Sequence, residues 1–498
     1  MVCEAINDLL NAPLYASAEE FIQHSLTEAR PAKIPLNGHK YPKVSYLDPR
    51  CWRNSDHFLQ DLPETLERLA ASPLCAELRT GLEEAFAITK SRTVVLSLSG
   101  GVDSSSTLIL LSALRYNTSV DWELRALYMG YSGNRENLEE ARSELNLVAW
   151  LCQQCQVQLF AFNVDLPRPH GPEGTSSSGV TRDEYETQTK AIRFRMYGLV
   201  GGDDCVVVLG HHQDDVDENR LEQLSRGHVM GDMDGMHRVR ESPPGLSRCI
   251  VCRPLIHNRK ANFIATATEA SIPYVRDSTP AWSVRGITRR ALDAVLRDHN
   301  AAAMHQLLAD VAAMSARAAE LVVSIAESGV MEPRELRSKS KGTCLTFWRL
   351  DLRRIFSHGE LADVLPKLIS SINDVAQLWN QALPRGQDAV RRIPPVKDWH
   401  SVVFERVVST CIEKMKSGEK VSRKALNHLF HEAGSPGIRC GGFTETLGFV
   451  SDGSREVMLL YVIDKKNNTV KDRRQEVVKL LERLPLLTFA AWLSFGND

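Results

Sequence analysis

The sequence predicts an α/β protein: a parallel-sheet domain is followed by a helical region and a small α+β module. Short apolar runs alternate with helical patterns between residues 93 and 255, which is typical of parallel strands joined by crossover helices. A glycine turn with two small hydroxyls follows the first run, and a histidine and acid cluster follows the fourth. Both are expected at the carboxyl edge of the sheet, where open parallel sheets bind ligands.

Five segments are expected to be strands, and helical patterns separate the first four: Thr93–Ser99, Leu124–Met129, Val157–Val164, Cys205–Gly210 and Cys249–Leu255. The Pro, Gly and Ser-rich segment 167–181 is expected to be a mobile surface loop. Later in the chain, Ala301–Ser328 and Ser422–Ala433 have helical spacing, and Val457–Val462 is expected to be a strand.

At 498 residues the chain is too long for one ordinary core. We predict four parts: an N-terminal helical extension (1–90), the parallel-sheet domain (91–298), a helical region (299–395) and the α+β module (396–498). The 43% hydrophobic and 24% charged composition is that of a soluble globular protein. No secretory leader, transit peptide or bilayer-spanning segment is apparent, so a cytoplasmic protein without membrane contact is expected.

Ser99, Gly100, Gly101, Val102, Asp103 and Ser104 form the glycine turn before an apolar helix. Its glycines let the backbone N–H groups approach a phosphate, and the helix start adds partial positive charge. No lysine follows the second glycine, which excludes the loop type that holds ATP for terminal phosphate transfer.

The second cluster begins at Gly210 and contains His211, Asp214, Asp215 and Glu218. Carboxylates at this density can hold Mg²⁺, and a histidine beside them can orient phosphate or move a proton. The alternative is a solvated helix start, where acids are favoured in any case. A phosphate loop expected at the same sheet edge favours the functional interpretation.

The loop Ser99–Ser104 resembles the SGGxDS loop of the PP-loop ATP pyrophosphatases, which have a Rossmann-like fold of the adenine nucleotide alpha hydrolase type. The later landmarks Gly210–Glu218, Arg226-Gly227, Gly235-Met236, Arg253–Ile256 and Asp277–Thr279 resemble those of tRNA(Ile)-lysidine synthases. The resemblance covers roughly residues 93–296.

This resemblance implies that ATP and Mg²⁺ are bound, that AMP is placed on the C2 oxygen of a cytidine in tRNA, and that lysine or another small nucleophile displaces it. Ser99–Ser104 and Gly210 would cradle the nucleotide. Asp103 and Asp214 would hold Mg²⁺, and Asp103, His211, Asp214, Asp215 and Glu218 would be catalytic. Arg253, Arg285 and Arg289 would contact RNA. A homodimer is an open alternative to a monomer.

Two residues depart from the family pattern. Pro280 and Gly286 stand where the family has asparagines, while Arg285 and Arg289 are kept. The two arginines could therefore still contact phosphate, while the hydrogen bonds of the two asparagine amides are lost. The identity of the amine that displaces AMP is therefore left open.

Cys152 with Cys155, and Cys249 with Cys252, have spacings that also occur in zinc and iron–sulfur sites. Cys249 and Cys252 would face opposite sides of a strand, so buried structural thiols are the favoured interpretation.

The segment Arg334–Arg354 is basic and contains two aromatic residues. Arg349, Arg353 and Arg354 are candidates for RNA binding; the alternative is a solvated face with core aromatics. The leading hypothesis for the chain is a tRNA-modifying ligase of the lysidine synthase type. The alternatives are another PP-loop reaction, such as thiolation or amide formation, and a degenerate RNA-binding scaffold.

Overall fold

The computed structural model describes residues 9, 18–36, 62–117, 120–131, 138–164, 166, 182–276, 284–298, 301–325, 331–337, 344–351, 358–383, 392–396, 403, 406, 439–442, 447–451 and 457–463. The chain divides into two compact units. The first contains residues 1–219, 234–290 and 385–390, and the second contains the remainder. Segment 167–181 and the helix expected at 422–433 lie outside the described residues.

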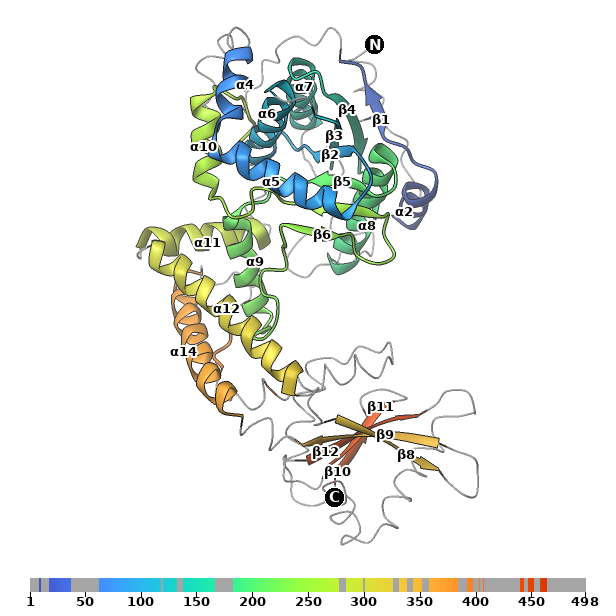
Figure 1. The fold of residues 1–498 in the computed structure, drawn as a ribbon, viewed down its shortest axis with the longest axis vertical. Coiled ribbons are helices and arrows are strands. Elements are labelled where there is room, and N and C mark those ends of the chain that lie inside the picture. Colours follow the sequence, from blue (N-terminus) through green and yellow to red (C-terminus); the bar gives the residue numbers. More distant parts are fainter. Residues whose placement is uncertain are drawn as a thin grey trace. The chain divides into compact units, whose positions relative to one another are not determined.

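The first unit is built on a seven-stranded sheet in the order β1-β4-β3-β2-β5-β7-β6. Figure 1 shows this sheet with helices around it. The strands are β1 (Ala32–Ile34), β2 (Thr93–Ser97), β3 (Glu123–Gly130), β4 (Gln158–Asn163), β5 (Cys205–Val208), β6 (Val239–Glu241) and β7 (Cys249–Cys252). From β4 to β7 all neighbours are parallel, while β1 and β6 pair antiparallel at the two edges. The five predicted strands and the parallel sheet are confirmed, and the two short edge strands were missed.

The strand order reverses between β2 and β5. From β2 the chain proceeds through β3 and β4 in one direction, then returns to place β5 on the other side of β2. The loops that leave two such strands diverge to opposite faces of the sheet, and ligands bind in the crevice between them. The glycine turn follows β2 and the histidine cluster follows β5, so the topology brings the two predicted motifs together.

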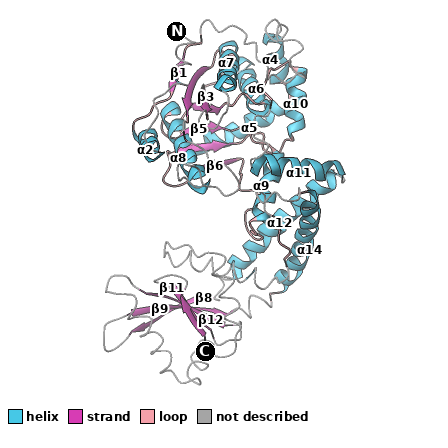
Figure 2. Cartoon of the chain, turned by 180° about the vertical axis from the view of Figure 1, so that it is seen from behind, coloured by secondary structure: helices cyan, strands magenta, loops and turns pink. Residues whose placement is uncertain are grey.

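Helices cover both faces of this sheet (Figure 2). One face carries α4 (Leu62–Ala70), α5 (Pro73–Ile88), α6 (Val102–Asn117), α7 (Leu138–Gln154) and α10 (Lys260–Glu269). The other carries α2 (Ala18–Thr27) and α8 (Arg182–Gly201). Successive strand residues alternate between the two cores: Val94 and Leu96 pack with the first set, whereas Val95 packs with the second. Both faces are therefore buried, as the continuous apolar runs predicted.

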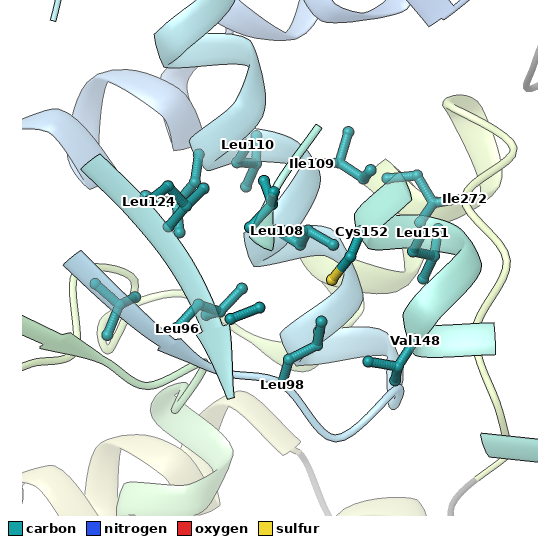
Figure 3. Close-up of a cluster of buried hydrophobic side chains, with 14 of the residues drawn as sticks. Leu96, Leu98, Leu108, Ile109, Leu110, Leu124, Val148, Leu151, Cys152 and Ile272 are labelled. Atoms are coloured by element: carbon teal, nitrogen blue, oxygen red, sulfur yellow. The ribbon is translucent and has the colours of Figure 1, made fainter. Parts of the chain in front are cut away.

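The larger core lies between β2, β3 and the helices α6 and α7 (Figure 3). Leu96, Leu98 and Leu108 are at most 1% exposed there, and the sulfur of Cys152 lies among them. This packing fixes the start of α6, and therefore the glycine turn, against the sheet.

The expected boundary at residue 90 does not separate two cores. Ile34, Leu66 and Leu78 belong to the same buried cluster as the central strands. The extension is also not wholly helical, because β1 pairs with β4. Arg195 on α8 donates hydrogen bonds to the carbonyl oxygens of Ser25 (2.8 Å) and Thr27 (2.7 Å), which holds the end of α2.

Two further helices follow the loops of the sheet edge, α9 (Gln213–Ser225) and α11 (Val284–Asp298). The second unit contains α12 (Ala301–Ile325), α14 (Gly359–Ala382) and a five-stranded antiparallel sheet in the order β10-β11-β12-β9-β8. Its strands are β8 (Met331–Arg337), β9 (Cys344–Asp351), β10 (Arg439–Gly442), β11 (Leu447–Ser451) and β12 (Val457–Ile463). Within the described ranges, no helix combines the length and apolarity needed to cross a bilayer.

The expectation of a helical region over 299–395 is wrong for β8 and β9. These strands form a hairpin, and β9 pairs with the predicted strand β12. The aromatic and β-branched residues of 344–351 favour a strand, and Pro333 is tolerated because β8 is an edge strand.

Candidate active site at the carboxyl edge of the parallel sheet

The glycine turn is held rigid between β2 and α6. Gly100 has φ +83°, a backbone conformation that favours glycine, and a Cβ there would lie in tight contact with Val148 Cγ2, at 3.2 Å. Val275 N–H donates to the Gly100 carbonyl (2.9 Å), and the hydroxyls of Ser99 and Ser104 lie 3.1 Å apart. These contacts come from both ends of the turn and fix its shape before any ligand binds.

The first turn of α6 supplies hydrogen-bond donors at this position. The helix begins at Val102, so the N–H groups of Val102, Asp103 and Ser104 have no partner within the helix. Such groups, together with the helix dipole, favour phosphate. The predicted cradle of Ser99–Ser104 is therefore physically suited to an anionic ligand.

Gly210 brings the second loop against the first. A Cβ at Gly210 would lie 3.1 Å from the main-chain carbon and oxygen of Asp103. Only glycine permits this approach between the end of β5 and the first turn of α6. Gly210 thus sets the distance between the glycine turn and the histidine cluster.

His212, the second histidine of the cluster, lies among the carboxylates of the site. The His212 side chain is 1% exposed, and its Nε2 lies 3.4 Å from Asp103 Oδ1. Its Nδ1 lies 3.5 Å from Asp214 Oδ2 and 3.5 Å from Asp215 Oδ2. Burial lowers the pKa of His212, but the contact with Asp103 and the negative charges of Asp215 and Asp214 outweigh it, so the pKa lies above its ordinary value.

Asp215 and His212 also form the start of α9. The Asp215 carboxylate accepts from the His212 N–H (3.1 Å), and the Asp215 N–H donates to His212 Nδ1 (3.4 Å). This reciprocal pair satisfies two helix N–H groups in the manner of a capping box. Asp215, predicted to be catalytic, is 4% exposed and has a structural role at this helix start.

Asp214 joins α9 to the start of α10. Its Oδ2 accepts from the Lys260 N–H (2.7 Å), and its Oδ1 lies 3.5 Å from Arg259 Nη1. Arg259 also donates to the fully buried Asp217 (2.6 Å). The N-termini of α6, α9 and α10 therefore converge around His212 and Asp103.

Lys260, Arg259 and His212 were not among the predicted site residues. Lys260 Nζ lies 3.8 Å from Asp103 Oδ2, so Asp103 faces one cation and one imidazole. Lys260 is the first residue of α10, shortly after Arg253-Pro254-Leu255-Ile256. A basic pair at a helix start that follows a strand end was the available signal.

Glu218 and Arg289 are paired. Arg289 Nε donates to Glu218 Oε1 (2.7 Å), and Arg289 Nη2 lies 3.9 Å from Asp215 Oδ1. Arg289, expected to contact RNA, thus joins α11 to the acidic face of α9. Arg285 lies on the first turn of α11, and Pro280 lies outside the described residues.

Arg253, which was expected to contact RNA, is a buried residue. It is 7% exposed, and its Nε donates to His211 Nδ1 (3.0 Å) while Nη1 donates to the His237 carbonyl (3.0 Å). Both bonds join Arg253 to groups inside the fold. Its predicted role in RNA binding stays a prediction.

The cysteines of the described residues behave as structural thiols. Cys249 packs with the α8 face of the sheet and Cys252 with the α6 face, as their spacing predicted. Burial raises the pKa of Cys155 to about 11 and that of Cys252 to about 12. Across the described part of the chain, no group of three or more His, Cys, Asp or Glu side chains is arranged to hold a metal ion.

Of the basic candidates in the second unit, Arg349 lies on β9, and Arg353 and Arg354 lie outside the described residues. Their role in RNA binding stays a prediction.

Residues 74–294 match the PP-loop domain family. Similar curated proteins include the tRNA(Ile)-lysidine synthase of Aromatoleum aromaticum, 28% identical over 197 residues that cover 40% of this chain and 41% of the relative. The tRNA-cytidine(32) 2-sulfurtransferase of Pelobacter propionicus is 25% identical over 241 residues, 47% of this chain and 83% of that protein. The match to two lysidine synthases spans about half of their length, 41% and 52%. Among solved structures, the U34-tRNA thiolase NcsA from Methanococcus maripaludis is similar at 14% identity and a TM-score of 0.34, over 53% of this chain and 80% of that one.

Proposed function

Residues 74–294 form a PP-loop domain, and from this premise we propose that the protein is an adenylating enzyme that modifies tRNA. The observation that carries the proposal is the convergence of three helix N-termini, with the glycine turn, around Asp103 and His212. This arrangement suits a phosphate-rich ligand whose reacting end lies beside carboxylates and an imidazole.

In the proposed first step, the C2 oxygen of a cytidine attacks the α-phosphorus of ATP. The bond from the α-phosphorus to its bridging oxygen breaks, and pyrophosphate leaves into the cradle of Ser99–Ser104. The N–H groups at the start of α6 and the ammonium of Lys260 face the charge that the leaving group carries.

In the proposed second step, an amine attacks C2, the C2–O bond breaks, and AMP leaves with the oxygen. Because only the neutral amine is nucleophilic, the amine must lose a proton to a nearby base or bind in a desolvated pocket. Lysine is the proposed amine. The carboxylates of Asp214 and Glu218 lie at this edge, where the ammonium group of lysine would compete for them with Arg259 and Arg289 before the proton leaves.

The residues present suit a magnesium ion that accompanies ATP. Asp103 Oδ1 is buried and faces His212 Nε2 at 3.4 Å, and Mg²⁺ is commonly held by one or two carboxylates together with substrate phosphates. Asp103 would hold it, with Asp214 as the second candidate. The ion would neutralise charge on the phosphates.

Thiolation is the second candidate function, because curated sulfurtransferases are among the similar proteins. That reaction passes sulfur through a thiolate or a cluster. The described cysteines favour the amine route: Cys249 and Cys252 face opposite cores, and burial raises the pKa of the Cys152 and Cys155 thiols.

The test is incubation of the protein with ATP, tRNA and isotope-labelled lysine, without a sulfur donor. We expect AMP, pyrophosphate and labelled tRNA. A variant with alanine at Cys152, Cys155, Cys249 and Cys252 serves as the control for thiolation, and it should keep lysine transfer as long as it folds.

Sulfur incorporation into tRNA, lost in the folded cysteine variant, would replace the amine route by thiolation. AMP formation on tRNA without lysine uptake would keep adenylation and leave a different acceptor. Release of ADP and phosphate instead of AMP would contradict the proposal as a whole.

A further inference from the structure

The contact between Arg253 and His211 determines which ring nitrogen of the histidine carries the proton. Arg253 Nε donates to His211 Nδ1 at 3.0 Å, and Nη1 donates to the His237 carbonyl at 3.0 Å. The main-chain N–H of Arg253 also donates to the Arg238 carbonyl (2.7 Å). The guanidinium is therefore held by two acceptors, His211 Nδ1 and the His237 carbonyl oxygen, in a buried position.

A guanidinium carries only donors, so the nitrogen that receives its hydrogen bond must be an acceptor. His211 Nδ1 is then without a proton, and in the neutral ring the proton resides on Nε2. A doubly protonated imidazolium has no acceptor and would have to break the bond to Arg253. The second nitrogen of a histidine commonly sets its tautomer in this way.

Arg253 remains a cation at neutral pH. Burial and the nearby Arg240 lower its pKa to about 10, which still leaves the guanidinium protonated under the conditions of an assay. The hydrogen-bond direction is therefore fixed over the neutral pH range.

His211 is partly exposed and follows β5, directly before His212, which contacts Asp103. It therefore lies at the sheet edge where the glycine turn ends. Resting on the proposed function, we propose that Arg253 is a positioning residue that holds His211 as the Nε2–H tautomer. In this tautomer His211 donates a hydrogen bond to an oxygen of the reacting group and does not accept a proton from that group.

The tautomer is measured directly by NMR on protein with ¹⁵N-labelled histidine, using long-range ¹H–¹⁵N correlations. The signals of His211 are those missing in His211→Gln. We expect the Nε2–H pattern in the wild type and a mixture of tautomers in Arg253→Met. Arg240→Met is the matched control, because Arg240 bonds the Gly235 carbonyl (3.3 Å) and not His211; it should keep the wild-type pattern.

Two substitutions of His211 then show whether it acts as a hydrogen-bond donor or as a general base in the tRNA-dependent release of AMP. A glutamine amide can replace the donor at Nε2, whereas an asparagine amide reaches only the position of Nδ1. We expect kcat of His211→Gln to exceed that of His211→Asn by at least about tenfold, within the ~10²-fold range of a lost catalytic donor. Arg253→Met should lower kcat with little change in the KM for ATP.

A wild-type ring in the Nδ1–H tautomer or the imidazolium form overturns the inference, and equal losses of kcat in His211→Gln and His211→Asn do so too. The proposed function fails separately. If the wild type releases no AMP with tRNA, adenylation is wrong, while the NMR pattern still decides whether Arg253 fixes the tautomer.

Discussion

At the scale of single residues, Asp103 is the centre of the site. It lies in the first turn of α6, faces the imidazole of His212 and lies within 3.8 Å of the Lys260 ammonium. Its Oδ1 is buried and faces His212 Nε2 at 3.4 Å, so the charge of Asp103 lies between an imidazole and an ammonium group. The glycines of the two loops act through the backbone. Gly100 adopts a positive φ, and Gly210 lets the end of β5 approach the main chain of Asp103.

Asp103→Asn should reduce release of AMP and pyrophosphate by at least about 100-fold, because it removes the negative charge between His212 and Lys260. The measurement is product release from ATP in the presence of tRNA. Asp121→Asn is the control, since Asp121 is an exposed partner of Arg92 (3.1 Å) remote from the glycine turn. Equal rates for the two variants would remove Asp103 from the site.

At the scale of elements, the site depends on how three helices begin. His212 and Asp215 start α9, and Asp214 satisfies the first N–H of α10. Arg259 then bonds the buried Asp217 of α9 (2.6 Å). A change in either helix start therefore moves both, and with them the carboxylates beside the glycine turn.

Arg259→Met should lower the free energy of unfolding by about 3 kcal/mol, because Asp217 would keep a fully buried charge without its guanidinium partner. The readout is the shift of the urea unfolding transition of the first unit. Arg68→Met removes the exposed pair with Glu269 (3.4 Å) and should cost less than about 1 kcal/mol. Similar shifts in both variants would contradict a structural role for the buried pair.

The raised pKa values of three thiols, those of Cys75, Cys155 and Cys252, predict a loss of stability at alkaline pH. Burial raises the pKa of Cys75 and Cys155 to about 11 and of Cys252 to about 12, whereas unfolded thiols lose their protons near pH 8.5. Above that pH the unfolded chain binds fewer protons than the folded one, so stability falls as pH rises towards 11–12.

The test is the Tm between pH 8 and 11, compared with a variant that has alanine at Cys75, Cys155 and Cys252. We expect a smaller decrease in the variant. Identical slopes would show that these thiols titrate alike in both states.

At the scale of the whole molecule, one unit contains the candidate active site and the other contains two long helices and an antiparallel sheet. The chain is nearly neutral, with a formal charge of −2, so RNA binding would depend on local patches. The basic segment that includes β8 and β9 in the second unit is the predicted patch.

Binding of tRNA should weaken steeply with salt. Replacing Arg349, Arg353 and Arg354 by alanine should reduce the slope of log K against log salt by roughly one per lost phosphate contact. The control variant, alanine at the exposed residues Arg79 and Lys90 on and just after α5, should keep the wild-type slope. An unchanged slope in the triple variant would place the RNA site elsewhere.

The sequence by itself determined the parallel sheet and the two motif loops. Continuous apolar runs mark strands buried on both faces, and the Gly-Gly turn and Gly210 are local requirements of the backbone. It also indicated that Cys249 and Cys252 face opposite sides, because side chains alternate along a strand. These features follow from local patterns, which do not depend on distant residues.

Only the tertiary structure decided which side chains meet. His212 contacts Asp103, which lies more than 100 residues away in the chain, and His211 contacts Arg253, which lies more than 40 residues away. Lys260 joins the site because α10 starts beside α9, and β1 joins the sheet because β4 offers an open edge. Such contacts depend on strand order and packing, for which a single sequence carries no periodic signal.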